Sequence, residues 1–467
     1  MVNALAKRLI VGLSGPALTA SEVAWLEHYQ PAGVILFSRN CHDFPQLAGL
    51  CWQLQTLVPE LEIMADHEGG PVSQLARALG RPPVLQALGR LDDLALTARV
   101  HAETGRRLRA AGVTRVLAPV VDVLTESHNP VIGARAFGSD AQLVERHTVA
   151  AVTGLLEEGI LVCLKHWPGH GGSRHDTHLT GAVAGAGAIP APFVAGLNAG
   201  ADAIMVGHLQ TSDESELPAT LDSQFLRETA RELQKASGCR PRLIADDITM
   251  GGLREAMLAQ GIDPGDGLAA GLVEPAALPL AWLMALAKAG CEQLLLRGLP
   301  LGALPVPERS ASLAVTTKTT NPVEPHFADQ IYREARHRSW AVAATGFAAP
   351  AEPLLWWDQT VGDRWQVAGG DVGTAQEQLG PLLAPHFSAV HLWDGRPAEL
   401  GRFSRLLVTA HRPLLDPGQR DERLADRGVC LVMGHPSLAD DLQRYLGPGW
   451  TVGAVYDVSA TDLFSTG

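Results

Sequence analysis

The sequence predicts an α/β protein in which a (β/α)8 TIM barrel is followed by a smaller α/β sandwich domain. Short apolar segments alternate with amphipathic helical segments over about the first 300 of 467 residues. Polar residues stand where several of these apolar segments end, as in barrel strands that lead to an active site. A second series of apolar segments begins after a Pro/Ser/Thr-rich stretch. We therefore expect domains at residues 1–305 and 325–467, joined by a linker at 306–324.

Eight apolar, β-rich segments predict the strands of the barrel. Helical segments with apolar residues at three-and-four spacing, such as residues 21–30 and 91–112, lie between most of them. A strand followed by a helix, repeated eight times, is the pattern of a (β/α)8 barrel. The first segment, "LIVGLSG", is short and interrupted by glycine, so it fits a strand better than an export signal. The expected strands are residues 9–15, 33–40, 62–70, 114–123, 161–169, 203–209, 242–248 and 292–298.

The second domain is predicted by five further β-rich segments. The segment at 438–447, "LADDLQRYLG", is one of the helical stretches that separate some of them. No Gly-x-Gly-x-x-Gly fingerprint or phosphate loop accompanies them, so we expect no nucleotide there. The expected strands are residues 352–359, 388–396, 405–413, 428–436 and 451–459.

The overall composition excludes several classes of protein. The formal net charge of −13 argues against a nucleic-acid partner, because a phosphate backbone requires a basic surface. No apolar run approaches the ~20 residues of a membrane span. We expect a cytoplasmic protein with neither a nucleic-acid nor a membrane partner.

Charged residues occupy the ends of five predicted barrel strands. In such barrels the active site forms at the C-terminal ends of the strands, so these side chains should converge on one mouth. Side chains alternate along a strand, so Asp247 should point away from the mouth if its neighbour points toward it. The residues at the strand ends are Asp66, Asp122, Lys165 with His166, His208, and Asp246 with Asp247.

The segment 164–181, "LKHWPGHGGSRHDTHLTG", holds four of the 17 histidines. Two kinds of chemistry are compatible with it, a metal site and proton transfer. Metal hydrolases built on barrels often carry a His-x-His pair on the first strand, and residues 9–15 contain none, so we expect no metal and no other cofactor. Trp167 has two open interpretations, stacking on the face of a bound ligand or packing at the barrel rim. The candidate metal ligands of the segment are His166, His170, His175, Asp176 and His178.

Six segments together resemble glycoside hydrolase family 3, and more narrowly its β-N-acetylglucosaminidase branch. The resemblance covers about the first 300 residues in the right order, and its most specific part is Lys-His-x-Pro-Gly-His-Gly followed by Asp-x-His. Near the C-terminus, "AVYDVSATDL" resembles the α/β sandwich of two-domain members. The six segments are "GVILFSRN", "ADHEGGPVSQL", "APVVDV", "NPVIGARAFGSD", "KHWPGHGGSRHDTH" and "IADDITM".

The resemblance implies a role for each candidate site residue. Asp246 matches the nucleophile, His178 the acid/base, and Asp176 the carboxylate paired with that histidine. An unperturbed imidazole titrates at about 6.5, so a histidine serves as acid/base near neutral pH without a large pKa shift. Four further residues match positions that hold the sugar in the −1 subsite, and two more lie near the same mouth. The first four are Asp66, Arg135, Lys165 and His166, and the other two are Asp122 and His208.

The resemblance also implies the function. We expect a retaining β-N-acetylglucosaminidase that removes terminal β-linked GlcNAc from oligosaccharides or muropeptides through a covalent glycosyl-aspartate. Relatives commonly have Gln and Arg where this chain has His67 and Pro71, and Asp where it has Gly172. These differences bear on substrate preference more than on the chemistry.

Several alternatives remain open from the sequence. Phosphate instead of water as the acceptor would make the protein a phosphorylase, and a family 3 β-glycosidase of other specificity is also compatible. A metal-dependent barrel hydrolase agrees less well with the first strand. A non-catalytic carbohydrate-binding protein would not need Asp246 beside an Asp176–His178 pair.

Overall fold

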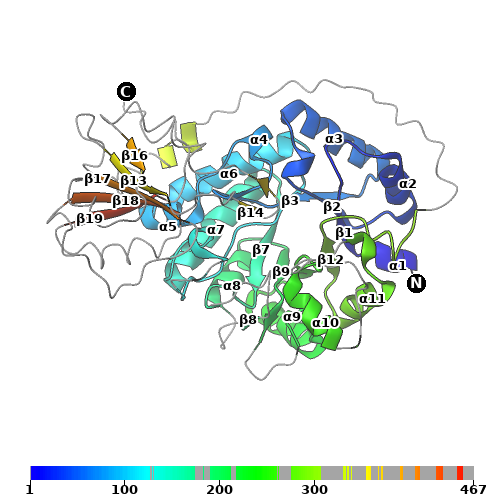
Figure 1. Ribbon diagram of the computed structural model, residues 1–467. Helices are drawn as coiled ribbons and strands as arrows, with labels where there is room; N and C mark the ends of the chain where they lie inside the picture. The colour runs from blue at the N-terminus through cyan, green and yellow to red at the C-terminus, as the bar shows by residue number, and fades with distance from the viewer. Residues whose placement is uncertain are drawn as a thin grey trace.

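The computed structural model contains a closed barrel of eight parallel strands with helices around it (Figure 1). This confirms the fold class predicted from the sequence. The last barrel strand pairs with the first, so that Leu9 lies opposite Leu294. The structure describes residues 2–126, 129, 131–173, 182–183, 190–211, 217–259, 261 and 275–306, the helical residues 330–332, 334–335 and 338, and the C-terminal strands given below.

All eight predicted barrel segments contain a strand. The order around the barrel is β1-β12-β11-β9-β7-β6-β3-β2, in which chain neighbours are also spatial neighbours. The strands are β1 (Leu9–Gly12), β2 (Gly33–Leu36), β3 (Glu62–Ala65), β6 (Arg115–Val116), β7 (Leu161–Trp167), β9 (Ala203–Val206), β11 (Arg242–Ala245) and β12 (Gln293–Leu296).

Helices follow the strands and cover the outside of the barrel (Figure 1). Several begin at side chains that bond the free N–H groups of the first turn: Thr19 forms a capping box, and Asp43, Asp93, Asp140 and Asp222 accept from backbone N–H groups. The helices are α1 (Val2–Ala6), α2 (Ala20–Tyr29), α3 (Phe44–Leu57), α4 (Ala76–Leu79), α5 (Leu85–Leu91), α6 (Leu94–Ala110), α7 (Ala141–Glu157), α8 (Ala191–Asn198), α9 (Ser223–Ser237), α10 (Gly251–Ala259) and α11 (Leu280–Ala289).

The alternation of side chains along the strands separates two apolar cores. Ile10, Ile35 and Met64 belong to a cluster to which strands around the whole barrel contribute, and this cluster fills the interior. Their neighbours Leu9 and Val11 belong to the larger cluster between strands and helices. On β7 the same alternation assigns Cys163 to the interior and Leu164 to the outer core, so Lys165 follows Cys163 on the interior side.

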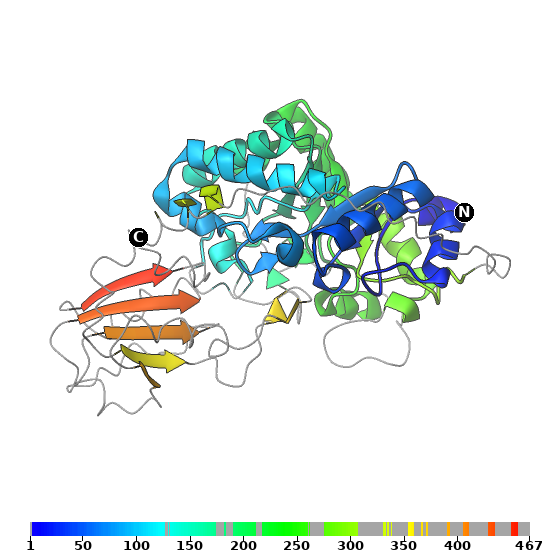
Figure 2. The same cartoon turned by 90° about the horizontal axis from the view of Figure 1, so that it is seen from above.

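The five predicted strands of the C-terminal region are also present. They form one parallel sheet in the order β16-β13-β17-β18-β19, which lies beside the barrel (Figures 1 and 2). Of the predicted linker at 306–324, residues 307–324 lie outside the described residues. None of the helices in the described parts of the chain has the length and apolar character needed to cross a membrane. The strands are β13 (Leu354–Asp358), β16 (Val390–Leu392), β17 (Arg405–Ala410), β18 (Gly428–Gly434) and β19 (Trp450–Val455).

Candidate active site

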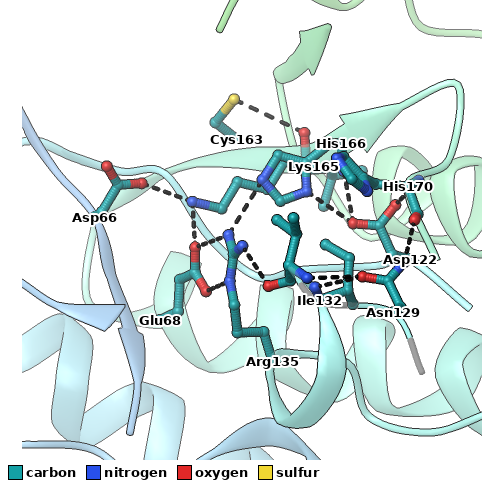
Figure 3. Close-up of polar contacts among 12 residues, drawn as sticks. Asp66, Glu68, Asp122, Asn129, Ile132, Arg135, Cys163, Lys165, His166 and His170 are labelled. Atoms are coloured by element: carbon teal, nitrogen blue, oxygen red, sulfur yellow. Dashed lines mark hydrogen bonds and ion pairs between the residues drawn. The ribbon is translucent and has the colours of Figure 1, made fainter. Parts of the chain in front are cut away.

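The charged residues predicted at the strand ends lie at the C-terminal mouth of the barrel. Because the eight strands are parallel and closed into a ring, residues that directly follow different strands share one end of it. Figure 3 shows that Asp66, Asp122, Arg135, Lys165 and His166 form one connected polar cluster. They come from the loops after β3 and β6 and from the end of β7.

Lys165 is the buried cation of this cluster. Its Nζ donates to Asp66 Oδ1 at 2.6 Å and forms an ion pair with Glu68 (Figure 3). Burial alone would lower the pKa of Lys165, but the negative charges of Asp66 and Glu68 outweigh it and raise the pKa above the ordinary value of 10.5. Lys165 is therefore a protonated donor at any working pH.

Glu68 is a site residue that the sequence analysis did not identify. Its carboxylate accepts from Arg135 Nε and Nη2, both at 2.8 Å, in a bidentate pair, and it also faces Lys165. The side chain is only 1% exposed. Burial alone would raise the pKa of Glu68, but the charges of Arg135 and Lys165 lower it to about 2.

A sequence signal for Glu68 does exist. β4 (His67–Gly69) is extended and pairs with β5 (Val72–Ser73), so side chains two positions apart share one face. Glu68 stands two positions after Asp66, so a predicted strand through this segment brings both carboxylates to the mouth. His67 stands between them and faces the opposite side.

Arg135 is held by the loop that follows β6. It ends the short 3₁₀ turn η2 (Gly133–Arg135), and its Nη1 donates to Val131 O at 3.1 Å. Asn129 shapes this loop: its Oδ1 accepts from the N–H groups of Val131 and Ile132, and its Nδ2 donates to His170 O at 2.7 Å. The Asn129 side chain thus ties the Arg135 loop to the loop after β7.

Asp122 orients His166. One carboxylate oxygen accepts from the backbone N–H of His166 at 3.1 Å and from its ring Nδ1 at 2.7 Å, and the other accepts from the His170 N–H at 2.7 Å. Arg135 Nη2 lies 3.2 Å from His166 Nε2, so Nε2 is the acceptor and Nδ1 carries the proton. Burial and the charges of Arg135 and Lys165 hold the pKa of His166 well below 6.5, so the ring is neutral.

The two adjacent aspartates after β11 differ in their surroundings. Asp247 Oδ1 accepts from Thr249 N at 3.0 Å and from Thr249 Oγ1 at 2.6 Å, and Oδ2 accepts from Arg297 Nε at 2.8 Å. Asp246 is partly exposed, and its charge acts on Asp66 and on His166. Both carboxylate oxygens of Asp247 therefore bond other residues of the protein, while Asp246 lies at the mouth.

His208 is buried and bonded at both ring nitrogens. Nδ1 lies 2.9 Å from Thr220 Oγ1, and Nε2 lies 3.0 Å from the backbone oxygen of Asp247. Since that oxygen only accepts, Nε2 carries the proton and Nδ1 accepts from the threonine hydroxyl. In this arrangement His208 supports the segment that carries Asp246, and its contact with a sugar stays a prediction.

Trp167 packs inside the protein. Its side chain is buried, its Nε1 donates to Thr229 Oγ1 at 3.1 Å, and its ring meets Phe193 edge-on at 5.2 Å. Of the two interpretations left open by the sequence, the structure supports packing between the barrel and its helices.

The predicted acid/base pair, Asp176 and His178, lies outside the described residues, as does His175. Among the residues that the structure does describe, no group of three or more His, Cys, Asp or Glu side chains is arranged to hold a metal ion. His170 lies near His166, with ring centroids 6.0 Å apart, and its backbone is bonded to Asp122.

Comparisons with known proteins give a consistent result. The family model described as "Glycosyl hydrolase family 3 N terminal domain" matches residues 5–265. A "Beta-hexosaminidase" of Xanthomonas campestris pv. campestris is 36% identical over 256 residues, which are 52% of this chain and 76% of that protein. A protein of the same name from Stenotrophomonas maltophilia is 35% identical and is covered to 75%.

Two of the similar solved structures cover different shares of the chain. A glycoside hydrolase family 3 β-N-acetylglucosaminidase from Paenibacillus sp. matches 99% of this chain and 95% of its own, with a TM-score of 0.73 at 20% identity. NagZ from Neisseria gonorrhoeae, solved in complex with N-trifluoroacetyl-D-glucosamine, matches 62% of this chain and 80% of its own, with a TM-score of 0.51 at 27% identity.

Proposed function

The chain belongs to glycosyl hydrolase family 3 and is a glycoside hydrolase, and on this premise we propose that it is a retaining β-N-acetylglucosaminidase. Its substrate is a small carbohydrate that ends in β-linked GlcNAc, such as an oligosaccharide or a muropeptide. The named β-hexosaminidase relatives support this activity, and so does the N-acyl glucosamine bound to the Neisseria protein. Fragments released during peptidoglycan turnover in the cytoplasm would carry such an end.

The observation that supports the proposal most is the position of Asp246. This carboxylate is partly exposed at the mouth and acts electrostatically on Asp66 and His166 of the buried cluster. A retaining glycosidase needs a carboxylate beside the anomeric carbon and hydrogen-bonding groups that fix the sugar ring. Asp66 and Lys165 place an acceptor and a donor side by side, and such a pair suits neighbouring sugar hydroxyls.

The proposed reaction has two steps. In the first, Asp246 attacks the anomeric carbon while the bond to the leaving oxygen breaks and His178 gives that oxygen a proton. In the second, His178 takes a proton from water, the water oxygen attacks the anomeric carbon, and the bond to Asp246 breaks. Asp176 accepts from the His178 ring and orients it. These two roles come from the resemblance, because both residues lie outside the described part of the chain.

The charges at the mouth support water, rather than phosphate, as the acceptor. Within the described residues, Lys165 and Arg135 are both already paired with Glu68, and Lys165 also with Asp66. Asp122 adds a further carboxylate, whereas Asp246 is held as the neutral glycosyl ester when the acceptor enters. An incoming phosphate would meet excess negative charge there, so hydrolysis is favoured over phosphorolysis.

Product analysis tests the proposal. The protein should hydrolyse aryl β-GlcNAc far faster than aryl β-glucoside, and the product should be GlcNAc whether or not inorganic phosphate is present. Formation of GlcNAc 1-phosphate would establish the phosphorylase alternative. Equal rates on the two glycosides would contradict the proposed preference for the N-acetyl group.

Leaving-group dependence tests the acid/base role. His178→Ala should slow cleavage of a natural disaccharide by roughly 10²–10⁴-fold but spare an activated aryl leaving group, which needs little protonation. Azide should restore turnover with the aryl substrate by attacking the glycosyl-enzyme without a base. His175→Ala, in the same loop, is the matched control and should leave both rates unchanged. If His178→Ala slows cleavage of both substrates equally and azide restores neither rate, His178 is not the acid/base.

A further inference from the structure

A helical segment from beyond the predicted linker packs on the outside of α6. Its described residues lie between 330 and 338, and within it Tyr332 is only 1% exposed and Ala335 is fully buried. Both belong to an apolar cluster with residues of α5, α6 and α7. The segment therefore packs against the outer helices of the barrel.

Tyr332 makes two specific contacts with α6. The Thr104 hydroxyl donates to Val100 O at 2.8 Å, so it accepts from the Tyr332 hydroxyl at 2.7 Å. The guanidinium carbon of Arg107 lies 4.4 Å from the centre of the Tyr332 ring, a cation–π contact. Arg107 is itself buried and held by Glu103 Oε1 at 2.7 Å.

Ion pairs at the edge of this contact hold the same segment. Arg338 donates to Asp93 Oδ2 at 2.8 Å, and Arg99 pairs with Glu334. Asp93 is also the N-cap of α6, where it accepts from Leu96 N at 2.9 Å. The segment thus contacts α6 from its first turn to Arg107, over most of its length.

The apolar cluster that contains Tyr332 also includes residues next to Arg135 and close to Asp122 in the chain. Ile132 and Ala136, on either side of the Arg135 turn, are members of it, as is Leu124, two residues after Asp122. In the described part of this loop the regular structure is one short 3₁₀ turn, so packing beneath it adds to the hydrogen bonds of Asn129 in holding Arg135 in place.

A second connection runs through Arg107. Its Nη1 donates to Leu79 O at 2.8 Å, at the end of α4, in the same loop region as β4. Its charge also acts on buried His67, whose pKa is lowered to about 3, chiefly by burial and then by Arg107. His67 stands between Asp66 and Glu68, so the contacts of Tyr332 reach two neighbouring loops of the mouth, those after β3 and β6.

We propose that Tyr332 is a positioning residue for substrate binding: it packs against α6 and the apolar cluster beneath the Arg135 loop, and thereby holds Arg135 and Glu68 in register with the sugar. A residue from beyond the barrel would then complete the −1 subsite without touching it. This inference rests on the proposed function, since its kinetic test uses a β-GlcNAc substrate.

Three substitutions of Tyr332 distinguish an effect on substrate binding from a general loss of protein stability. Tyr332→Ala removes the ring, Tyr332→Leu keeps most of the buried volume but offers no ring to Arg107, and Tyr332→Phe loses only the hydroxyl. Leu286→Ala, which removes a fully buried side chain of α11, provides a destabilised control away from the cluster. Each is made in the full chain, and KM and kcat for aryl β-GlcNAc are measured well below every melting temperature.

Loss of positioning should appear in KM. Tyr332→Ala and Tyr332→Leu should raise KM about tenfold, the scale of one weakened hydrogen bond to a charged group, with a smaller change in kcat. Tyr332→Phe should restore most of the affinity, and Leu286→Ala should leave KM unchanged. Hydrogen exchange of peptides covering 129–137 should rise only in the Ala and Leu variants.

The outcomes are distinguishable. An unchanged KM and unchanged exchange at 129–137 in Tyr332→Leu would overturn the inference, even if the melting temperature falls. An equal rise of KM in Leu286→Ala would also overturn it, because the effect would then be general destabilisation. Failure of the unaltered protein to cleave aryl β-GlcNAc would instead contradict the proposed function, and the exchange measurement would still test the positioning.

Discussion

Glu68 connects both cations of the mouth through one buried carboxylate. Glu68→Gln keeps its shape but removes the charge that faces Arg135 and Lys165, which leaves two buried cations poorly compensated. We expect kcat/KM to fall by about 10²-fold or more, mainly through KM. Steady-state kinetics on aryl β-GlcNAc check this, with Glu60→Gln at an exposed position as the control. A variant with unaltered KM would show that Glu68 does not support sugar binding.

The same carboxylate makes stability depend on pH. The pKa of Glu68 is about 2 in the folded protein against an ordinary value of 4.5, so folding favours the ionised form. Its contribution, of order 3 kcal/mol, is complete above about pH 4.5 and is lost as the pH falls toward 2. Urea unfolding at pH 6, 4 and 3 should therefore show the stability advantage over Glu68→Gln shrinking with acid. An advantage that persists undiminished at pH 3 would contradict the lowered pKa.

Asp246 and Asp247 should respond differently to the same substitution. Asp246→Asn should keep the fold and lose almost all turnover, because an amide cannot form the glycosyl-enzyme bond. Asp247→Asn should mainly weaken the contacts with Thr249 and Arg297 and lower the melting temperature. A fluorinated glycosyl probe followed by peptide mapping should label Asp246, and a label on Asp247 would reverse the assignment.

At the scale of the elements, one ion network lies at the end of the barrel opposite the mouth. Arg115 begins β6 and is fully buried; it donates to Glu62 at the start of β3 and in bidentate fashion to Asp202 just before β9, each bond 2.7 Å long. Arg242 at the start of β11 also pairs with Glu62. The network joins four strands where the barrel has no catalytic role.

Arg115→Met should therefore affect stability and spare activity. Without Arg115, Glu62 keeps its pair with Arg242, but Asp202, which is 38% exposed, loses its cation, and the loss of these charged hydrogen bonds costs roughly 1.5–3 kcal/mol. Urea unfolding should show this loss, while kcat/KM at low temperature stays unaltered. Arg109→Met removes a largely exposed arginine and should change stability by less than about 1 kcal/mol. A large fall in kcat/KM of Arg115→Met would show that the two ends of the barrel are coupled.

The elements were largely predictable because each barrel strand carries a local signal. Strands such as Leu9–Gly12 and Arg242–Ala245 are short, mostly apolar runs that are followed by polar residues. This pattern can be read locally, without knowledge of distant contacts. The convergence of Lys165 and Asp66 on one mouth was predictable because the C-terminal ends of the parallel barrel strands lie together. The packing of Trp167 was not predictable from the sequence. Its Nε1 bonds Thr229 on a helix 62 positions away, and nothing local to Trp167 indicates that contact. The contact of Tyr332 with Thr104 spans 228 positions and has no local signature.

At the scale of the whole molecule, a segment from beyond the predicted linker packs against the helices of the barrel. The domain boundaries predicted from composition assign Tyr332 and Ala335 to the C-terminal domain, yet both are buried against α6 and its neighbours. We propose that the unit of stability is residues 1–338. A chain of residues 1–338 should melt roughly 5 °C or more above a chain of residues 1–305, since the shorter one exposes this cluster. Equal melting temperatures would place the boundary before the linker.

Closure of the barrel also has a consequence for synthesis on the ribosome. β1 completes its pairing only with β12, and the hydrogen bond from Arg8 to the backbone of Glu292 spans 284 positions. At ~5–20 residues per second, the partner strand is delivered roughly 15–60 s after β1. Throughout that interval one edge of Leu9–Gly12, four apolar or small residues, has no native partner, and such an edge is a template for pairing with other chains. Shielding of this edge, by the ribosome surface or by a chaperone, would therefore limit non-native pairing of the nascent protein until β12 leaves the exit tunnel.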